Sequence, residues 1–119
     1  MSYQETADNH GIDPADAGSV LLAAGAVETP PVLCHGASDS IGITEGQTKE
    51  EVRRRLQDAL ERLESEDDVE TRAQLAGQID PETADDIEKE NSTDDRTVIY
   101  VLIDNAKGLI RKTLRWLDV

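Results

Sequence analysis

The sequence predicts a mainly α-helical protein: a small domain of three to four helices with a long irregular or extended segment at residues 25–47. Three observations support this prediction. Apolar residues recur three and four positions apart in two long stretches, helix-capping residues precede those stretches, and proline and glycine gather at residues 25–47, ahead of them. The 119 residues have the length of one ordinary domain. We therefore expect a flexible N-terminal arm at residues 1–11 and a single helical domain at residues 12–119.

The beginning of the chain predicts the arm and one short helix. Residues 1–11 are polar and lack an apolar period, which is typical of a flexible terminus. In Ile12-Asp13-Pro14, Asp13 would cap a helix and Pro14 would occupy its first position, where the amide that proline lacks has no partner anyway. The helix expected over about 14–24 is rich in small residues, which favours close packing.

The next stretch predicts a connector. Residues 25–47 contain Pro30-Pro31 and, further on, three spaced glycines, a composition that disfavours a helix. Connectors longer than about 15 residues are unusual in compact domains. We interpret the stretch as a binding segment, or as a strand that a partner orders, rather than as an idle loop.

The middle of the chain predicts one strong helix and two weaker ones. Thr48 and Glu51 match a capping box, and apolar residues recur at helical spacing until the acidic run at 65–68. A weaker helix is expected over 69–78. Asp80-Pro81 then repeats the capping pattern before a short acidic helix at 81–90.

The last helix is expected over about 94–117. Residues 98–103 alone would also fit a strand, and Gly108 costs about 1 kcal/mol relative to alanine, but the period of the whole stretch favours a helix. Its broad apolar arc would suit a core element, a membrane-surface helix or an interface with another chain. Because the other helices present narrow apolar faces, we predict an interface. Beside the arc lies a stripe of cations predicted to contact acidic surface: Lys107, Arg111 and Arg115. The arc consists of Ile99, Leu102, Ile103, Ala106, Leu109, Ile110, Leu114, Trp116 and Leu117.

The net charge of −14 is distributed unevenly. Residues 1–48 carry seven acidic and no basic side chains, residues 49–104 carry 18 and eight, and residues 105–119 carry one and four. At molar salt the Debye length falls to about 3 Å, so the repulsion between the carboxylates is largely screened. Abundant acids, more arginine than lysine and no phenylalanine resemble the composition of proteins from salt-accumulating halophiles or their viruses. We therefore expect the protein to work at high salt.

Several classes of site are disfavoured by the sequence. We expect no cofactor, because the glycines do not form a phosphate-binding loop. We expect no metal or catalytic site: Cys34 and His35 are adjacent, a placement that rarely converges on one ion, and His10 and Asp39 add no spaced pair. The acidic charge disfavours direct contact with nucleic acid. No apolar run approaches the roughly 20 residues of a transmembrane segment.

These inferences predict a non-enzymatic protein–protein interaction or assembly component of a halophile or of a virus infecting one, for example a virion structural or connector protein. The expected partner is another protein, in a homo-oligomer or a larger assembly. The single cysteine favours a cytoplasmic or virion location, because it leaves no internal disulfide to form. The alternative is an acidic mimic of DNA or a regulatory protein, either of which would bind a nucleic-acid-binding partner.

Overall fold

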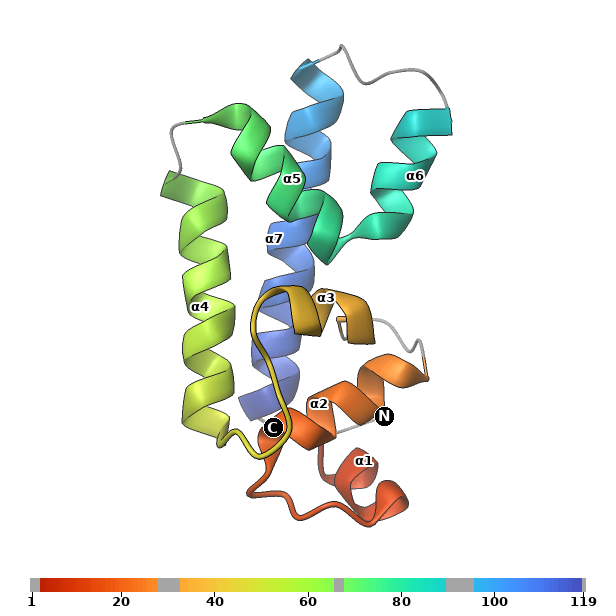
Figure 1. The fold of residues 1–119 in the computed structure, drawn as a ribbon, viewed down its shortest axis with the longest axis vertical. Helices are drawn as coiled ribbons and strands as arrows, with labels where there is room; N and C mark the ends of the chain where they lie inside the picture. Colours follow the sequence, from red (N-terminus) through yellow and green to blue (C-terminus); the bar gives the residue numbers. More distant parts are fainter. Residues whose placement is uncertain (1–2, 28–32, 66–67, 90–95, 119) are drawn as a thin grey trace.

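Helices form nearly all of the computed structural model, which describes residues 3–27, 33–65, 68–89 and 96–118. These residues contain no strand, so the prediction of a mainly α protein is confirmed (Figure 1). The helices are more numerous than the three to four expected, because short ones occur where the sequence shows no apolar period. The seven are α1 (Tyr3–His10), α2 (Ala17–Ala26), α3 (His35–Ser40), α4 (Lys49–Ser65), α5 (Val69–Ile79), α6 (Pro81–Lys89) and α7 (Arg96–Asp118).

The last helix, α7, is the centre of the fold. Its 23 residues are continuous, which confirms the helix expected over 94–117, although positions 94 and 95 lie outside the described residues. α4 runs antiparallel beside it, and α5 packs against its N-terminal half (Figure 1). Ion pairs join α4 to α7 near both ends of α4: Arg53 pairs with Asp118, and Glu64 pairs with Arg111 at 3.0 Å.

The apolar stripe of α4 supplies one side of the core. The helix begins at the predicted capping box, in which the Glu51 amide donates to Thr48 Oγ1 and the Thr48 amide donates to Glu51 Oε2, each at 3.3 Å. The cap satisfies two amides that the helix itself leaves unpaired. The buried residues of the stripe are Val52, Leu56, Ala59 and Leu63, and each large one contributes about 1.5–3 kcal/mol to folding by leaving water.

The expectation of a flexible arm at residues 1–11 is not met, because residues 3–10 form α1. Tyr3 anchors this helix: it is 1% exposed and its hydroxyl donates a hydrogen bond to the carbonyl oxygen of Pro14. Its ring meets Trp116 edge-on with centroids 5.3 Å apart, and Lys49 Nζ lies 4.3 Å from its centroid. Sequence periodicity did not predict α1, because its buried side chains are one aromatic ring, Tyr3, and the small Thr6 and Ala7, in place of a repeated apolar face.

The second helix starts later than predicted, since Asp16 rather than Asp13 is its N-cap. Asp16 Oδ1 accepts hydrogen bonds from the amides of Ser19 at 3.2 Å and Gly46 at 2.7 Å, so the same carboxylate also holds the loop before α4. Burial alone would raise the pKa of Asp16, but the hydrogen bonds from Ser19 and Gly46 outweigh it and lower the pKa. Asp13 instead accepts from the amide of Ala15 within a turn.

The segment at 25–47 is less irregular than predicted. Residues 25 and 26 complete α2, residues 35–40 form α3, and residues 28–32 lie outside the described residues. Cys34 is the N-cap of α3, where its Sγ accepts a hydrogen bond from the Ala37 amide at 3.4 Å. α3 has no apolar period of its own and is held by contacts with α2 and α5.

Two glycines let this segment pack directly on α2. A Cβ built on Gly18 would lie 1.9 Å from the carbonyl oxygen of Thr44, and one on Gly25 would lie 2.5 Å from the carbonyl oxygen of Leu33. The Gly18 amide also donates to the carbonyl oxygen of Gln47 at 3.0 Å. α2 is therefore covered by backbone of residues 33–47, which explains why seven of its ten residues are buried.

Candidate functional site

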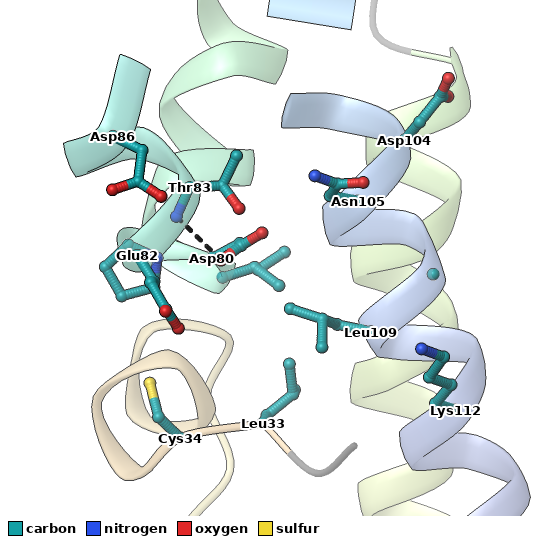
Figure 2. A pocket seen from close by; sticks show the side chains of 13 residues that line it. Leu33, Cys34, Asp80, Glu82, Thr83, Asp86, Asp104, Asn105, Leu109 and Lys112 are labelled. Atoms are coloured by element: carbon teal, nitrogen blue, oxygen red, sulfur yellow. Dashed lines mark hydrogen bonds between the residues drawn. The ribbon is translucent and has the colours of Figure 1, made fainter. Parts of the chain in front are cut away.

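A groove lies between α6 and α7, and residues 33 and 34, just before α3, close one end of it (Figure 2). Its volume is about 770 Å³, which falls within the range of roughly 300–1,000 Å³ typical of binding clefts. We call it the α6–α7 groove. Its walls come from three separate parts of the sequence, so only the tertiary fold brings them together.

A tight turn at Asp80 places α6 opposite α7. The Asp80 amide donates to the carbonyl oxygen of Ala76 at 2.8 Å, while Asp80 Oδ1 accepts from the Thr83 amide at 3.2 Å. Pro81 occupies the first position of α6, where its fixed φ and missing amide fit. The cap predicted for Asp80-Pro81 is confirmed. α6 lies beside α7 (Figure 1), and residues of both helices line the groove.

The inner surface of the groove is apolar. Leu33 and Ile79 lie beneath the groove and are each only 1% exposed. Half-buried Leu109 extends into the groove from α7 and is the large apolar side chain with accessible surface there (Figure 2). Gly108 lies next to Leu109 in the same wall. Apart from the backbone of its own helix, no described atom lies within 4 Å of a Cβ built on Gly108. The α7 wall therefore exposes a stretch of bare backbone beside an apolar side chain.

The rim of the groove is acidic. Asp80, Glu82 and Asp86 line it on the α6 side, and Asp104 lines it on α7, although its carboxylate points away from α6 (Figure 2). The cation among the lining residues is Lys112, so four carboxylates and one ammonium give the lining a formal charge of −3. Asp104 also lies 3.7 Å from Lys107 Nζ, one turn along its own helix. The groove therefore combines an apolar floor with an anionic entrance.

The nine residues of the predicted apolar arc are divided between the core and partly exposed positions. Six are buried inside the chain: Leu102, Ile103, Ala106, Ile110, Trp116 and Leu117. Ile99, Leu109 and Leu114 are only partly buried. α7 additionally exposes Tyr100 and Val101, at 44% and 49%. Most of the arc is therefore part of the core, and its three partly buried residues are the ones that could also contact a partner.

The three predicted cations lie in different surroundings. Lys107 pairs with Asp104 as described, and Arg111 reaches Glu64 of α4. Arg115 is exposed near the end of α7. One of the predicted contacts with an acidic side chain is therefore made within the chain, by Glu64 of α4.

Sequence reasoning did not assign Asp86, Asn105, Gly108 or Lys112 to a site. These residues line one groove only because α6 folds back against α7, and no local sequence pattern encodes the path of the chain from α5 into α6. One signal was available in the sequence. Gly108 interrupts the longest helix at a cost of about 1 kcal/mol relative to alanine, and the structure contains no close contact that requires it.

The other chemically notable residues do not converge in the described part of the chain. No group of three or more His, Cys, Asp and Glu side chains is arranged there to hold a metal ion. Cys34 lines the groove as the cap of α3, whereas His35 is exposed. The role predicted for this pair, incidental rather than catalytic, stays a prediction.

The comparisons with known proteins give no family: no protein-family model, no curated protein and no solved structure matches the chain. Among the described helices, none combines the length and the hydropathy that crossing a membrane requires.

Proposed function

We propose that the protein is a non-enzymatic interaction or assembly component that receives part of another polypeptide in the α6–α7 groove. The observation that carries this proposal is a groove of about 770 Å³ into which half-buried Leu109 projects, above the buried side chains of Leu33 and Ile79. Apolar surface in a concave site is stabilised when a partner covers it. Grooves between helices commonly receive apolar side chains of a partner helix.

Exposed apolar side chains elsewhere on α7 support a role in interaction. Tyr100 and Val101 leave about half of their surface exposed near the start of α7. Aromatic residues are enriched at protein interfaces, where a ring buries a large area at little cost in entropy. The charge of −14 adds support for a high-salt setting, in a halophile or in a virus of one.

A photocrosslinking experiment tests the proposal. A benzophenone amino acid replaces exposed Asn105 in the groove, or Glu45 on the loop between α3 and α4 as the control position. Each purified protein is illuminated in an extract of cells that express the natural protein. We expect a defined crosslinked polypeptide from position 105 that is absent at position 45.

The additional substitution Leu109→Asp should abolish this product, since it places a charge on the apolar floor. Circular dichroism must show that the variant retains its helices. The same products from both positions, or a product that Leu109→Asp leaves unchanged, would refute reception of a polypeptide in the groove.

A further inference from the structure

We infer that the occupant of the α6–α7 groove is a basic amphipathic helix of a partner protein, and that it crosses α7 at Gly108. This inference rests on the proposed function and specifies the chemistry of the partner. Three observations support it: the charge of the rim, the bare backbone at Gly108, and the periodicity of the α7 wall.

The charge of the rim selects a cationic occupant. Glu82 and Asp86 are exposed at the α6 edge, and the groove lining carries a net −3. At molar salt the Debye length is about 3 Å, so a partner's cations would keep their attraction to the rim carboxylates only in direct contact with them. A second copy of this chain has 26 acidic and only 12 basic side chains, so its surface offers few cations to pair with the rim. A partner segment rich in lysine or arginine suits this rim better.

The second observation is Gly108 itself. Glycine inside a helix is less stable than alanine, because it has more backbone freedom to lose on folding. At Gly18 and Gly25 the fold itself requires glycine despite this loss of helix stability, since a Cβ would collide with backbone of residues 33–47. At Gly108 there is open space, and this space belongs to the groove. A missing Cβ at this point lets the backbone of an occupant approach α7 closely.

The α7 wall has the geometry of a helix-docking face. Its lining residues are at positions 104, 105, 108, 109 and 112, which follow helical spacing along one side of α7. At 1.5 Å per residue this stripe is about 12 Å long, which matches two turns of a docked helix. Leu109 beside bare backbone would receive one apolar anchor, while cations beside that anchor meet Glu82 and Asp86 on α6.

Binding of two synthetic peptides to the full chain tests the inference. One is an 18-residue amphipathic helix of leucine and lysine, and the other has glutamate in place of every lysine. Titration calorimetry in 0.15 M KCl measures the affinity of each peptide. We expect the lysine peptide to bind with 1:1 stoichiometry and the glutamate peptide to bind at least about tenfold more weakly.

Variants locate the binding. Gly108→Leu should weaken binding of the lysine peptide at least about tenfold by filling the space at the crossing point, and Asp86→Lys should weaken it several-fold. The matched controls are Gln57→Leu on the exposed side of α4 and Glu45→Lys on the loop between α3 and α4. Both should bind like the natural chain. The melting temperature of Gly108→Leu should not fall, since leucine favours a helix more than glycine does.

Four results would overturn the inference: no binding of the lysine peptide, equal binding of both peptides, equal binding by Gly108→Leu, or equal loss in Asp86→Lys and Glu45→Lys. Light scattering that showed a dimer dissociated by Gly108→Leu would also overturn it, because a second copy would then occupy the groove. If these tests fail while position 105 still crosslinks a defined protein, the proposed function stands and only the basic helix is wrong.

Discussion

Replacing Gly18 by alanine should lower the free energy of unfolding more than the same substitution at a glycine with open space around its Cβ position. The new Cβ would lie 1.9 Å from the carbonyl oxygen of Thr44 and 3.2 Å from Gln47 Cβ. Real Cβ atoms essentially never come within 3.0 Å of such atoms, so α2 and the loop must separate by at least 1.1 Å. Because the obstacle is backbone, no side-chain rotation relieves the contact. The separation also disrupts the hydrogen bond from the Gly18 amide to Gln47.

The magnitude follows from these contacts. Overpacking typically costs about 1–3 kcal/mol, and loss of the hydrogen bond adds about 1 kcal/mol. Alanine returns about 0.5–1 kcal/mol through its better helix propensity. The free energy of unfolding should therefore fall by about 1–3.5 kcal/mol. For a domain of this size, that change lowers the melting temperature by roughly 4–14 °C.

Urea denaturation followed by circular dichroism measures the effect, with Gly36→Ala as the matched control. Gly36 also lies in a helix, but no described atom beyond its own helix backbone lies within 4 Å of a Cβ built there. Gly36→Ala should leave the protein as stable as the natural chain or slightly more stable. Equal unfolding midpoints for Gly18→Ala and Gly36→Ala would refute the close packing of residues 41–48 on α2.

Three further predictions concern the N-terminal helix, a capping carboxylate and salt. Tyr3→Ala should lower the free energy of unfolding by about 3–5 kcal/mol, whereas Tyr100→Ala, at a 44% exposed position, should change it by less than about 1 kcal/mol; equal effects in urea titrations would show that α1 is not anchored. The folded-state pKa of Asp16 is lowered, so its contribution to stability is present above the ordinary value of 3.8 and is lost as pH falls through the folded value. The stability difference between the natural chain and Asp16→Asn should therefore shrink as pH drops below about 4, and a difference independent of pH would contradict this role. The melting temperature should rise steeply from low to molar KCl, because repulsion among 26 acidic side chains is screened; a midpoint unaffected by salt would count against adaptation to brine.

The sequence predicted the elements whose apolar residues repeat over many turns. α4 and α7 present long apolar faces, and the period of such a face is visible without knowledge of the partner. α1 and α3 present no such face. Tyr3 secures the first through contacts with Lys49 and Trp116, which are distant in sequence, and α2 and α5 support the second. Helices stabilised by single long-range contacts leave no local pattern to detect.

The candidate site was harder to predict than the fold. A helical wheel shows which residues of α7 share a side, but not how many neighbours cover that side. α4 and α5 together bury residues such as Ile103 and Ile110, which the sequence equally suggested for an interface. The groove instead lies where α6 diverges from α7 beyond Asp80. That path depends on how tightly the chain turns from α5 into α6, and no spacing of apolar residues encodes it.

The cationic end of an otherwise acidic chain also has a structural explanation. Because α4 and α7 are antiparallel, Glu64 near the end of α4 lies beside Arg111, while Arg53 near its start lies beside Asp118. These side chains are between 38% and 53% exposed, and such pairs contribute about 0–1 kcal/mol, less at high salt. Their contribution to the free energy of folding is therefore small, but their positions favour the antiparallel alignment of α4 and α7. With Arg111 directed to α4 and Lys107 beside Asp104, Lys112 is the lining cation left to face the carboxylates of α6, so the groove keeps a negative charge that a partner's cations can neutralise.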